Sequence, residues 1–228
     1  MLARKPYSII PHGLYGIYPN ETRSEARAAF KLSTDSIVIG FLGDIRRYKG
    51  LDRLFDAFNE TSPGEATLFV AGKAVDLRYG KDVRERLCLI AAGGRSIVYR
   101  DERLSEVALG TAIRACDLVV LPYYTTWNSG LALLVLETGG RLLTSDLPVF
   151  HELRDELGSE WVQIYNEPLT GRKLIEAARA SADVSTRRME TFRAARDWAQ
   201  IGEKTVAFYE RLRAADNESR LQPTGPDR

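Results

Sequence analysis

Short apolar runs alternate with amphipathic segments along most of the chain. Several runs are apolar at successive positions, as in a strand that is covered on both faces of a parallel sheet. The segments between them repeat apolar residues at the spacing of a helix that packs on one side. The predicted strands cover residues 8–10, 36–43, 66–72, 96–99, 118–121, 141–144 and 161–165. The predicted helices cover residues 21–32, 51–59, 82–92, 104–116, 128–137 and 149–157.

This alternation predicts an α/β fold. Strand and helix follow one another about six times with short connections, which indicates a doubly wound, parallel, Rossmann-like sheet of about six strands. From Gly171 onward the pattern is purely helical, and we expect either one long helix from Thr186 or a pair broken near Gly202. The predicted domains are therefore an α/β domain at 1–182, a helical extension at 183–215 and a disordered polar tail at 216–228.

Ligands in sheets of this kind bind where the strands end, at the carboxyl edge. The loop Asp44–Gly50 leaves such an edge and carries Arg46, Arg47 and Lys49. An arginine offers phosphate a two-pronged fork and a lysine offers a compact charge, so the loop suits a diphosphate. A solvated basic turn is the alternative interpretation of these residues.

A second unusual loop, Pro122–Gly130, leaves the predicted strand at 118–121. It leads into a helix that Asn128 or Ser129 would cap, and Gly130 would let a ligand approach the backbone closely. The free N–H groups at the start of a helix attract anions. We therefore expect both loops to face one cleft, although an ordinary strand-loop-helix unit has the same local pattern.

Charge and cysteine content narrow the class of protein. The 228 residues include 32 Lys plus Arg against 31 Asp plus Glu, so nothing in the net charge favours nucleic-acid binding. Cys88 and Cys116 lack metal-ligand spacing and are interpreted as reduced core residues of a cytoplasmic protein. There is no run of about 20 apolar residues, and the basic residues 1–6 allow at most peripheral contact with the inner face of a membrane. No metal is expected.

Five short motifs occur in a fixed order along the chain. They are Ile-Pro-His-Gly at 10–13, Gly43 with Lys49-Gly50, Val-Ala-Gly at 70–72, Asp117 to Pro122, and Gly130 through Glu137. The ordered set resembles the nucleotide-sugar-binding, C-terminal half of GT-B glycosyltransferases of the group 1, retaining type, which includes many bacterial polysaccharide, lipopolysaccharide and mannosyl transferases. The resemblance covers about residues 7–212.

The resemblance implies roles for individual residues. Lys49 matches the lysine of the family's diphosphate loop, which begins at Gly43, while Asp44 stands where the family has arginine. Arg46 would then supply the guanidinium. Glu137 matches the second glutamate of a Glu-x7-Glu motif, which binds the ribose, but Ser129 replaces the first, which binds the sugar. This replacement leaves the identity of the sugar, and turnover itself, open.

Further side chains are candidates for the rim of the cleft and for contact with the nucleobase. Tyr123, Trp127 and Asn128 could contact the sugar or pack the rim, and His12 could face the cleft or serve its turn. The resemblance places the nucleobase beside the strand end that precedes Glu102 and Arg103. No catalytic residue is assigned.

The predicted function is transfer of a sugar from a nucleotide diphosphate sugar to a glycan or lipid-linked acceptor, with no cofactor. The alternative is a nucleotide-sugar-binding subunit without turnover. A third possibility, an unrelated doubly wound nucleotide-binding protein, would be favoured by a Gly-x-Gly-x-x-Gly loop, which the sequence lacks. Because the family binds its acceptor in an N-terminal domain, we expect a second domain or partner chain. The apolar stripe of the last helix would supply part of the contact: Trp198, Ile201, Phe208, Tyr209 and Leu212.

Overall fold

A computed structural model describes residues 7–16, 20–180 and 186–221. The chain divides into two compact units. One is Tyr15–Met189, and the other joins Met1–Leu14 to Glu190–Arg228. The predicted boundaries differ from this division, because they assigned the residues before Tyr15 to the α/β domain. We describe each unit by itself.

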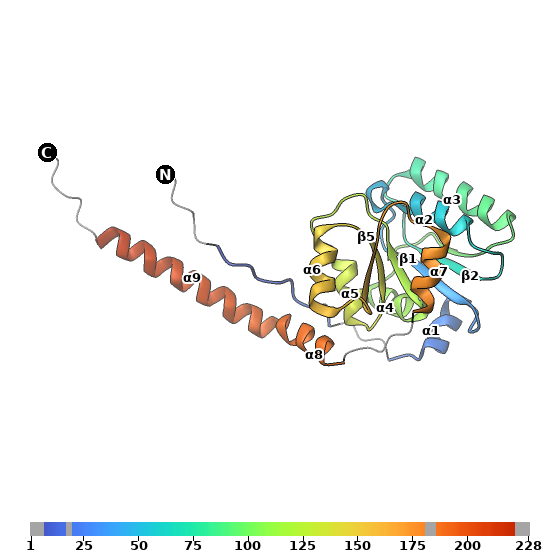
Figure 1. Ribbon diagram of the computed structural model, residues 1–228. Coiled ribbons are helices and arrows are strands. Elements are labelled where there is room, and N and C mark those ends of the chain that lie inside the picture. Colours follow the sequence, from blue (N-terminus) through green and yellow to red (C-terminus); the bar gives the residue numbers. More distant parts are fainter. Residues whose placement is uncertain (1–6, 17–19, 181–185, 222–228) are drawn as a thin grey trace. The chain divides into compact units, whose positions relative to one another are not determined.

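Six parallel strands form the single sheet of the larger unit, in the order β3-β2-β1-β4-β5-β6 (Figure 1). Every neighbouring pair is parallel, which confirms the predicted fold class. The strands are β1 (Ile37–Leu42), β2 (Ala66–Ala71), β3 (Ser96–Arg100), β4 (Leu118–Leu121), β5 (Leu142–Ser145) and β6 (Val162–Tyr165).

Helices cover both faces of this sheet (Figure 1). On one face α2 contacts α3 and α7, and on the other α4 contacts α1 and α5. Successive side chains of each strand point to opposite faces of the sheet. Leu68 belongs to the core that α2, α3 and α7 cover, whereas the ring of its neighbour Phe69 lies 5.0 Å from the ring of Phe30 in α1. The helices of this unit are α1 (Arg23–Phe30), α2 (Leu51–Asn59), α3 (Leu77–Ala92), α4 (Glu106–Ala115), α5 (Gly130–Glu137), α6 (Pro148–Leu157) and α7 (Gly171–Arg179), and α8 (Thr186–Ala195) begins in this unit and ends in the other.

Helix α3 begins five residues before the predicted start at Asp82. The reason is Asp76, whose carboxylate accepts hydrogen bonds from the N–H groups of Arg78 and Tyr79 and so caps the helix. Cys116 is buried as expected, but Cys88 lies on the exposed side of α3, so its assignment to the core is wrong.

A buried ion pair ties α1 to the amino end of β4. The side chain of Arg27 is 4% exposed, and its guanidinium donates to the Asp117 carboxylate at 2.6 Å and to three main-chain carbonyls. The same carboxylate accepts from Arg23 and from the N–H of Val38 at the start of β1. Asp117 therefore joins three elements at the edge of the sheet opposite the predicted cleft.

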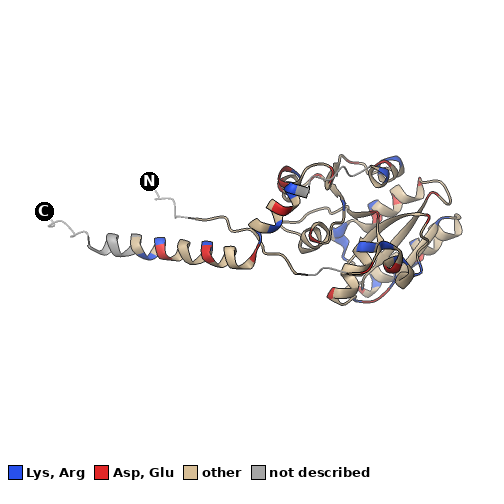
Figure 2. Cartoon of the chain, turned by 90° about the horizontal axis from the view of Figure 1, so that it is seen from below, with Lys and Arg blue, Asp and Glu red and all other residues tan. Residues whose placement is uncertain are grey.

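The smaller unit contains α9 (Trp198–Leu221) and the described residues before Tyr15. Leu14 donates its N–H to the Arg196 carbonyl, and its own carbonyl accepts from Trp198 Nε1 at 2.7 Å. The predicted strand at 8–10 is not formed, because no strand of the described residues pairs with this segment. Figure 2 shows both acidic and basic residues on the coloured part of α9.

Two predictions about the C-terminal region are wrong. The helical break falls between α8 and α9, at residues 196–197, and Gly202 lies inside α9. The predicted disordered tail is helical as far as Leu221, and its remaining residues lie outside the described ranges. Over the part of the chain that the structure describes, no helix is long and apolar enough to cross a membrane.

Candidate functional site

The strand order reverses between β1 and β4. From these two central strands the connections run outward in opposite directions, and sheets of this kind bind ligands in a crevice outside the carboxyl ends of the strands at such a point. The two loops meet at its base. Tyr124 donates its N–H to the Tyr48 carbonyl at 2.8 Å, and Gly50 packs so closely on the Pro122 carbonyl that a Cβ there would overlap it. The structure thus confirms that both loops lie together at the carboxyl edge.

Lys49 places a half-buried ammonium in this crevice. A Cβ built on Gly43 would lie 3.7 Å from Lys49 Nζ and 3.9 Å from Leu131 in the first turn of α5, so these three groups share one place. Among the described residues Nζ has no hydrogen-bond or ion-pair partner. Burial lowers the pKa of Lys49 to about 8, against the opposing charge of Asp44. The site therefore holds an ammonium group whose N–H donors have no acceptor among the described residues.

The start of α5 supplies the other anion-binding element. Ser129 caps the helix through its hydroxyl, which accepts from the N–H of Ala132 at 3.2 Å. The first N–H groups of a helix have no partner within it, and the dipole is positive there. Tyr123, only 3% exposed, lies behind both elements, with Lys49 Nζ 5.9 Å from its ring centroid, and burial raises the pKa of its phenol. Gly43, Lys49, Tyr123, Ser129 and Gly130 are thus brought together.

Three other predicted residues of the larger unit are exposed. Arg46 is half exposed and pairs with Asp44 at 3.4 Å. Trp127 is 96% exposed, and Asn128 is exposed, its carbonyl accepting from the Thr126 hydroxyl. His12 belongs to the smaller unit, where its ring contacts that of Trp198.

Glu137 departs most from its predicted place. Its side chain is fully buried at the end of α5, and its two carboxylate oxygens accept the N–H groups of Tyr15 and Gly16 at 2.8 and 2.7 Å. The Tyr15–Gly16 backbone therefore covers a carboxylate that was predicted to face the cleft, and ribose binding by Glu137 stays a prediction. Sequence reasoning missed Tyr15, which carries no periodic or motif signal.

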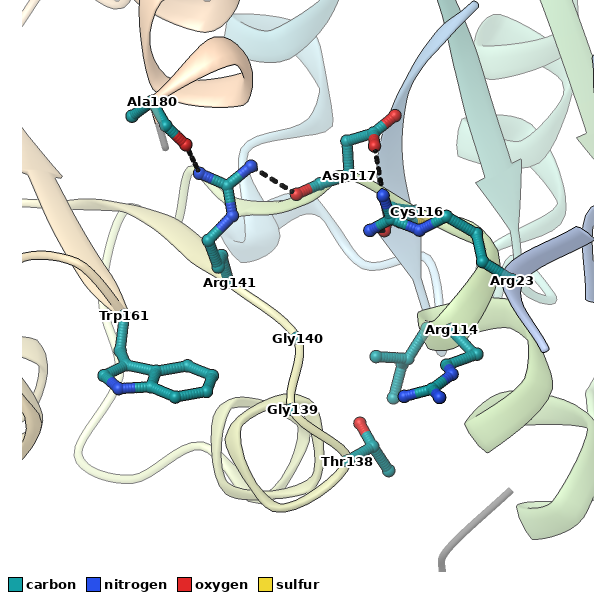
Figure 3. Close-up of a pocket in the computed structure, with 11 residues that line it drawn as sticks. Arg23, Arg114, Cys116, Asp117, Thr138, Gly139, Gly140, Arg141, Trp161 and Ala180 are labelled. Carbon is teal, nitrogen blue, oxygen red and sulfur yellow. Dashed lines mark hydrogen bonds and ion pairs between the residues drawn. The ribbon is translucent and has the colours of Figure 1, made fainter. Parts of the chain in front are cut away.

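A pocket of about 440 Å³ on the amino edge of the sheet is not part of this site (Figure 3). Figure 3 shows Arg141 directed at the Ala180 carbonyl and at Asp117, which in turn holds Arg23. Arg141 also donates to the carbonyls of Ala177 and Ala178 in the last turn of α7. These arginines neutralise helix C-termini and Asp117, which accounts for them without a ligand.

A pocket of about 220 Å³ adjoins the crevice at the carboxyl ends of β1, β2 and β3. Leu104 and Leu109 give it an apolar wall, and Asp44 gives it an acceptor that Arg103 holds at 3.3 Å. It includes Gly43, which it shares with the Lys49 group, so a ligand could extend from one to the other. The remaining lining residues are Ala71, Gly72 and Lys73.

Replacing Gly50 by alanine should push the two loops apart. Gly50 has a φ of +64°, where an L-residue costs roughly 1–2 kcal/mol, and the new Cβ would also overlap the Pro122 carbonyl. Gly64 has a φ of +80° with nothing within 4 Å, so Gly64→Ala isolates the conformational cost. Urea unfolding should show the larger loss for Gly50→Ala, and equal losses would mean that the loops do not depend on this contact.

No model of a known protein family matches the chain. A curated relative, the GDP-mannose:glycolipid 4-beta-D-mannosyltransferase of Xanthomonas campestris pv. campestris, is 26% identical over 179 residues, which are 78% of this chain and 50% of the relative. Another, the ribosomal RNA small subunit methyltransferase H of Mesorhizobium japonicum, is 24% identical over 201 residues, 88% of this chain and 51% of the relative. The chain thus spans about half the length of the curated relatives it matches.

Solved structures agree on the fold. Sucrose-phosphate synthase from Thermosynechococcus elongatus superposes with a TM-score of 0.69 and 21% identity, over 90% of this chain and 52% of that one. The C-terminal domain of a group 1 family glycosyl transferase from Francisella tularensis superposes with a TM-score of 0.57 and 19% identity, over 79% of this chain and 92% of that domain. Together with the strand order and the carboxyl-edge crevice, these matches show that the chain has the fold of one Rossmann-like half of a GT-B group 1 glycosyltransferase.

Proposed function

We propose that the chain binds a nucleoside diphosphate sugar in the crevice between β1 and β4 and presents the sugar for transfer to a glycan or lipid-linked acceptor. The observation that carries the proposal is the position of Lys49. Its ammonium lies beside Gly43 and the first turn of α5 without a counter-charge in hydrogen-bond range among the described residues. Lysine and a helix N-terminus together suit two adjacent phosphate groups.

The same elements would act on the reaction itself. When the bond from the sugar to the diphosphate breaks, negative charge grows on the departing oxygen, and fixed donors aimed at it lower the barrier. Lys49 and the α5 N–H groups are such donors. The adjoining pocket at Gly43, Leu104 and Leu109 would take the nucleobase. Ribose binding by Glu137 is not part of this proposal, and neither is a resident metal or cofactor.

Transfer is proposed to require a second domain or a partner chain. The described residues that meet in the crevice include no carboxylate beside the start of α5, where Ser129 stands. Exposed apolar side chains on α9, among them Val206 and Tyr209, fit such a partner. A nucleotide-sugar-binding subunit without turnover is the second candidate, and Ser129 is the residue that favours it. Either would act in the cytoplasm, with at most peripheral contact with the membrane.

Calorimetric titration of the wild-type chain with UDP and with GDP tests the binding claim. Saturable binding of at least one is expected, and S-adenosylmethionine serves as the control ligand because one relative is named as a methyltransferase. Binding of S-adenosylmethionine alone would overturn the proposal. Sugar transfer is then assayed with and without an added acceptor-binding domain. Binding without transfer in both assays selects the subunit.

A further inference from the structure

The carboxylate of Glu137 fixes a distant piece of backbone. It closes α5, is fully buried, and accepts the N–H groups of Tyr15 and Gly16, which lie 122 and 121 residues away in the sequence. Hydrogen bonds to an ionised acceptor are about twice as strong as neutral ones. Two of them on successive N–H groups hold the backbone at Tyr15 in one orientation.

The side chain of Tyr15 reaches back to the other end of the same helix. Its hydroxyl packs so closely on Gly130, the first residue of α5, that a Cβ at Gly130 would overlap it. Tyr15 remains 44% exposed, so the residue is not enclosed in the core. Contact with Tyr15 thus accounts for the residue type at both positions. The Tyr15 hydroxyl leaves room only for glycine at 130, and the Tyr15 backbone N–H is bound by glutamate at 137.

The hydroxyl is therefore held where the diphosphate is proposed to lie. Leu131, the next residue of α5, lies with Lys49 Nζ around Gly43. A phenol can donate one hydrogen bond, and phosphate oxygens accept readily. Tyr15 would complete a set of donors in which Lys49 and the helix supply the rest.

We propose that Tyr15 binds the donor phosphate through its hydroxyl, and that Glu137 is a positioning residue that acts through Tyr15 rather than a ribose ligand. This inference rests on the proposed function, because it needs a nucleoside diphosphate in the crevice. It differs from a purely structural tie, since it makes the two residues interdependent in ligand binding. It also differs from a blocking role, in which the hydroxyl would compete with phosphate.

A double-mutant cycle on UDP and GDP affinity tests the proposal with wild type, Tyr15→Phe, Glu137→Gln and the double variant. Tyr15→Phe keeps the ring and both N–H groups and removes only the hydroxyl. Glu137→Gln keeps the shape but turns one acceptor into a donor that faces an N–H group. Each single change should weaken binding about ten-fold, and the double variant should bind no more weakly than the weaker single one.

A ribose readout separates the two roles of Glu137. The ratio of GDP to 2′-deoxy-GDP affinity should be the same in wild type and Glu137→Gln, because the carboxylate does not touch the sugar. Two results would overturn the inference in favour of ribose binding. One is that the affinity losses of the two single variants add in the double variant, and the other is that the ratio of GDP to 2′-deoxy-GDP affinity falls to about one in Glu137→Gln. Tighter binding by Tyr15→Phe would overturn it in favour of a blocking hydroxyl.

Failure of the proposed function gives a different result. If Lys49→Ala weakens binding while Tyr15→Phe leaves it unchanged, the crevice is the nucleotide site and only the roles of Tyr15 and Glu137 are wrong. If wild type binds neither UDP nor GDP, the proposed function and this inference both fall.

Discussion

Replacing Asp117 by alanine is expected to lower the free energy of unfolding by about 3–5 kcal/mol, because it leaves a buried arginine without its counter-charge. The carboxylate accepts from Arg27 at 2.6 Å, from Arg23 at 2.8 Å and from the N–H of Val38 at 2.7 Å. Arg27 is 4% exposed and cannot turn to water without disrupting its three bonds to carbonyls. Chemical denaturation of the purified variant measures the loss.

Two further variants sharpen this measurement. Asp82→Ala removes an exposed carboxylate that lies 3.9 Å from Arg47, and pairs of this kind contribute about 0–1 kcal/mol. Adding Arg27→Met to Asp117→Ala removes the stranded charge and should recover part of the stability. If Asp117→Ala costs no more than Asp82→Ala, the ion pair does not hold α1 to the sheet as described.

Replacing Lys49 by alanine is expected to weaken nucleoside diphosphate binding about ten- to hundred-fold, the effect of losing a charged hydrogen bond to phosphate. The fold should persist, because the ammonium makes no hydrogen bond or ion pair with the described residues and its burial is unfavourable. Calorimetry with UDP and GDP measures the change, and unaltered affinity for both would exclude Lys49 from the site.

The pH dependence of wild-type binding gives an independent check on Lys49. Burial lowers its pKa to about 8, so the ammonium is protonated below that pH and loses its charge as the pH rises through it. Affinity should therefore be highest near pH 7 and decline toward pH 9. Lys49→Arg stays charged over this whole range and should show no such decline. The same profile in both proteins would assign the titration to another group.

The pattern of apolar residues predicted the sheet well, because a parallel strand must be apolar on both faces and a short run makes that visible. Where prediction went wrong, the deciding interaction was not periodic. The Ser-Ile-Ile segment at 8–10 resembles a strand but pairs with no strand of the described residues. Gly202 is tolerated inside α9 although glycine lowers helix propensity. Asp76 moved the start of α3 because a cap acts through one hydrogen-bonding side chain.

The residues of the candidate site likewise divide into those that the sequence could predict and those that it could not. Gly43, Lys49 and Ser129 could be found from the sequence because each lies in the connection that follows a strand, and parallel strands end at one edge. The surroundings of Glu137 could not, since its partners Tyr15 and Gly16 are more than a hundred residues away. A glutamate two turns into a helix can face a cleft or a crossing backbone, and only the three-dimensional structure distinguishes them. Arg46 was predicted from its charge and from the replacement of the family's arginine by Asp44, and neither reveals that Arg46 pairs with Asp44.

A crystal structure of the chain with bound GDP or UDP tests the central claim most directly. The account predicts diphosphate oxygens within hydrogen-bond distance of Lys49 Nζ and of the first N–H groups of α5, with the base in the pocket beside Gly72. A nucleotide bound instead in the amino-edge pocket between Arg23 and Arg141, or anywhere that leaves Lys49 without a phosphate contact, would contradict it.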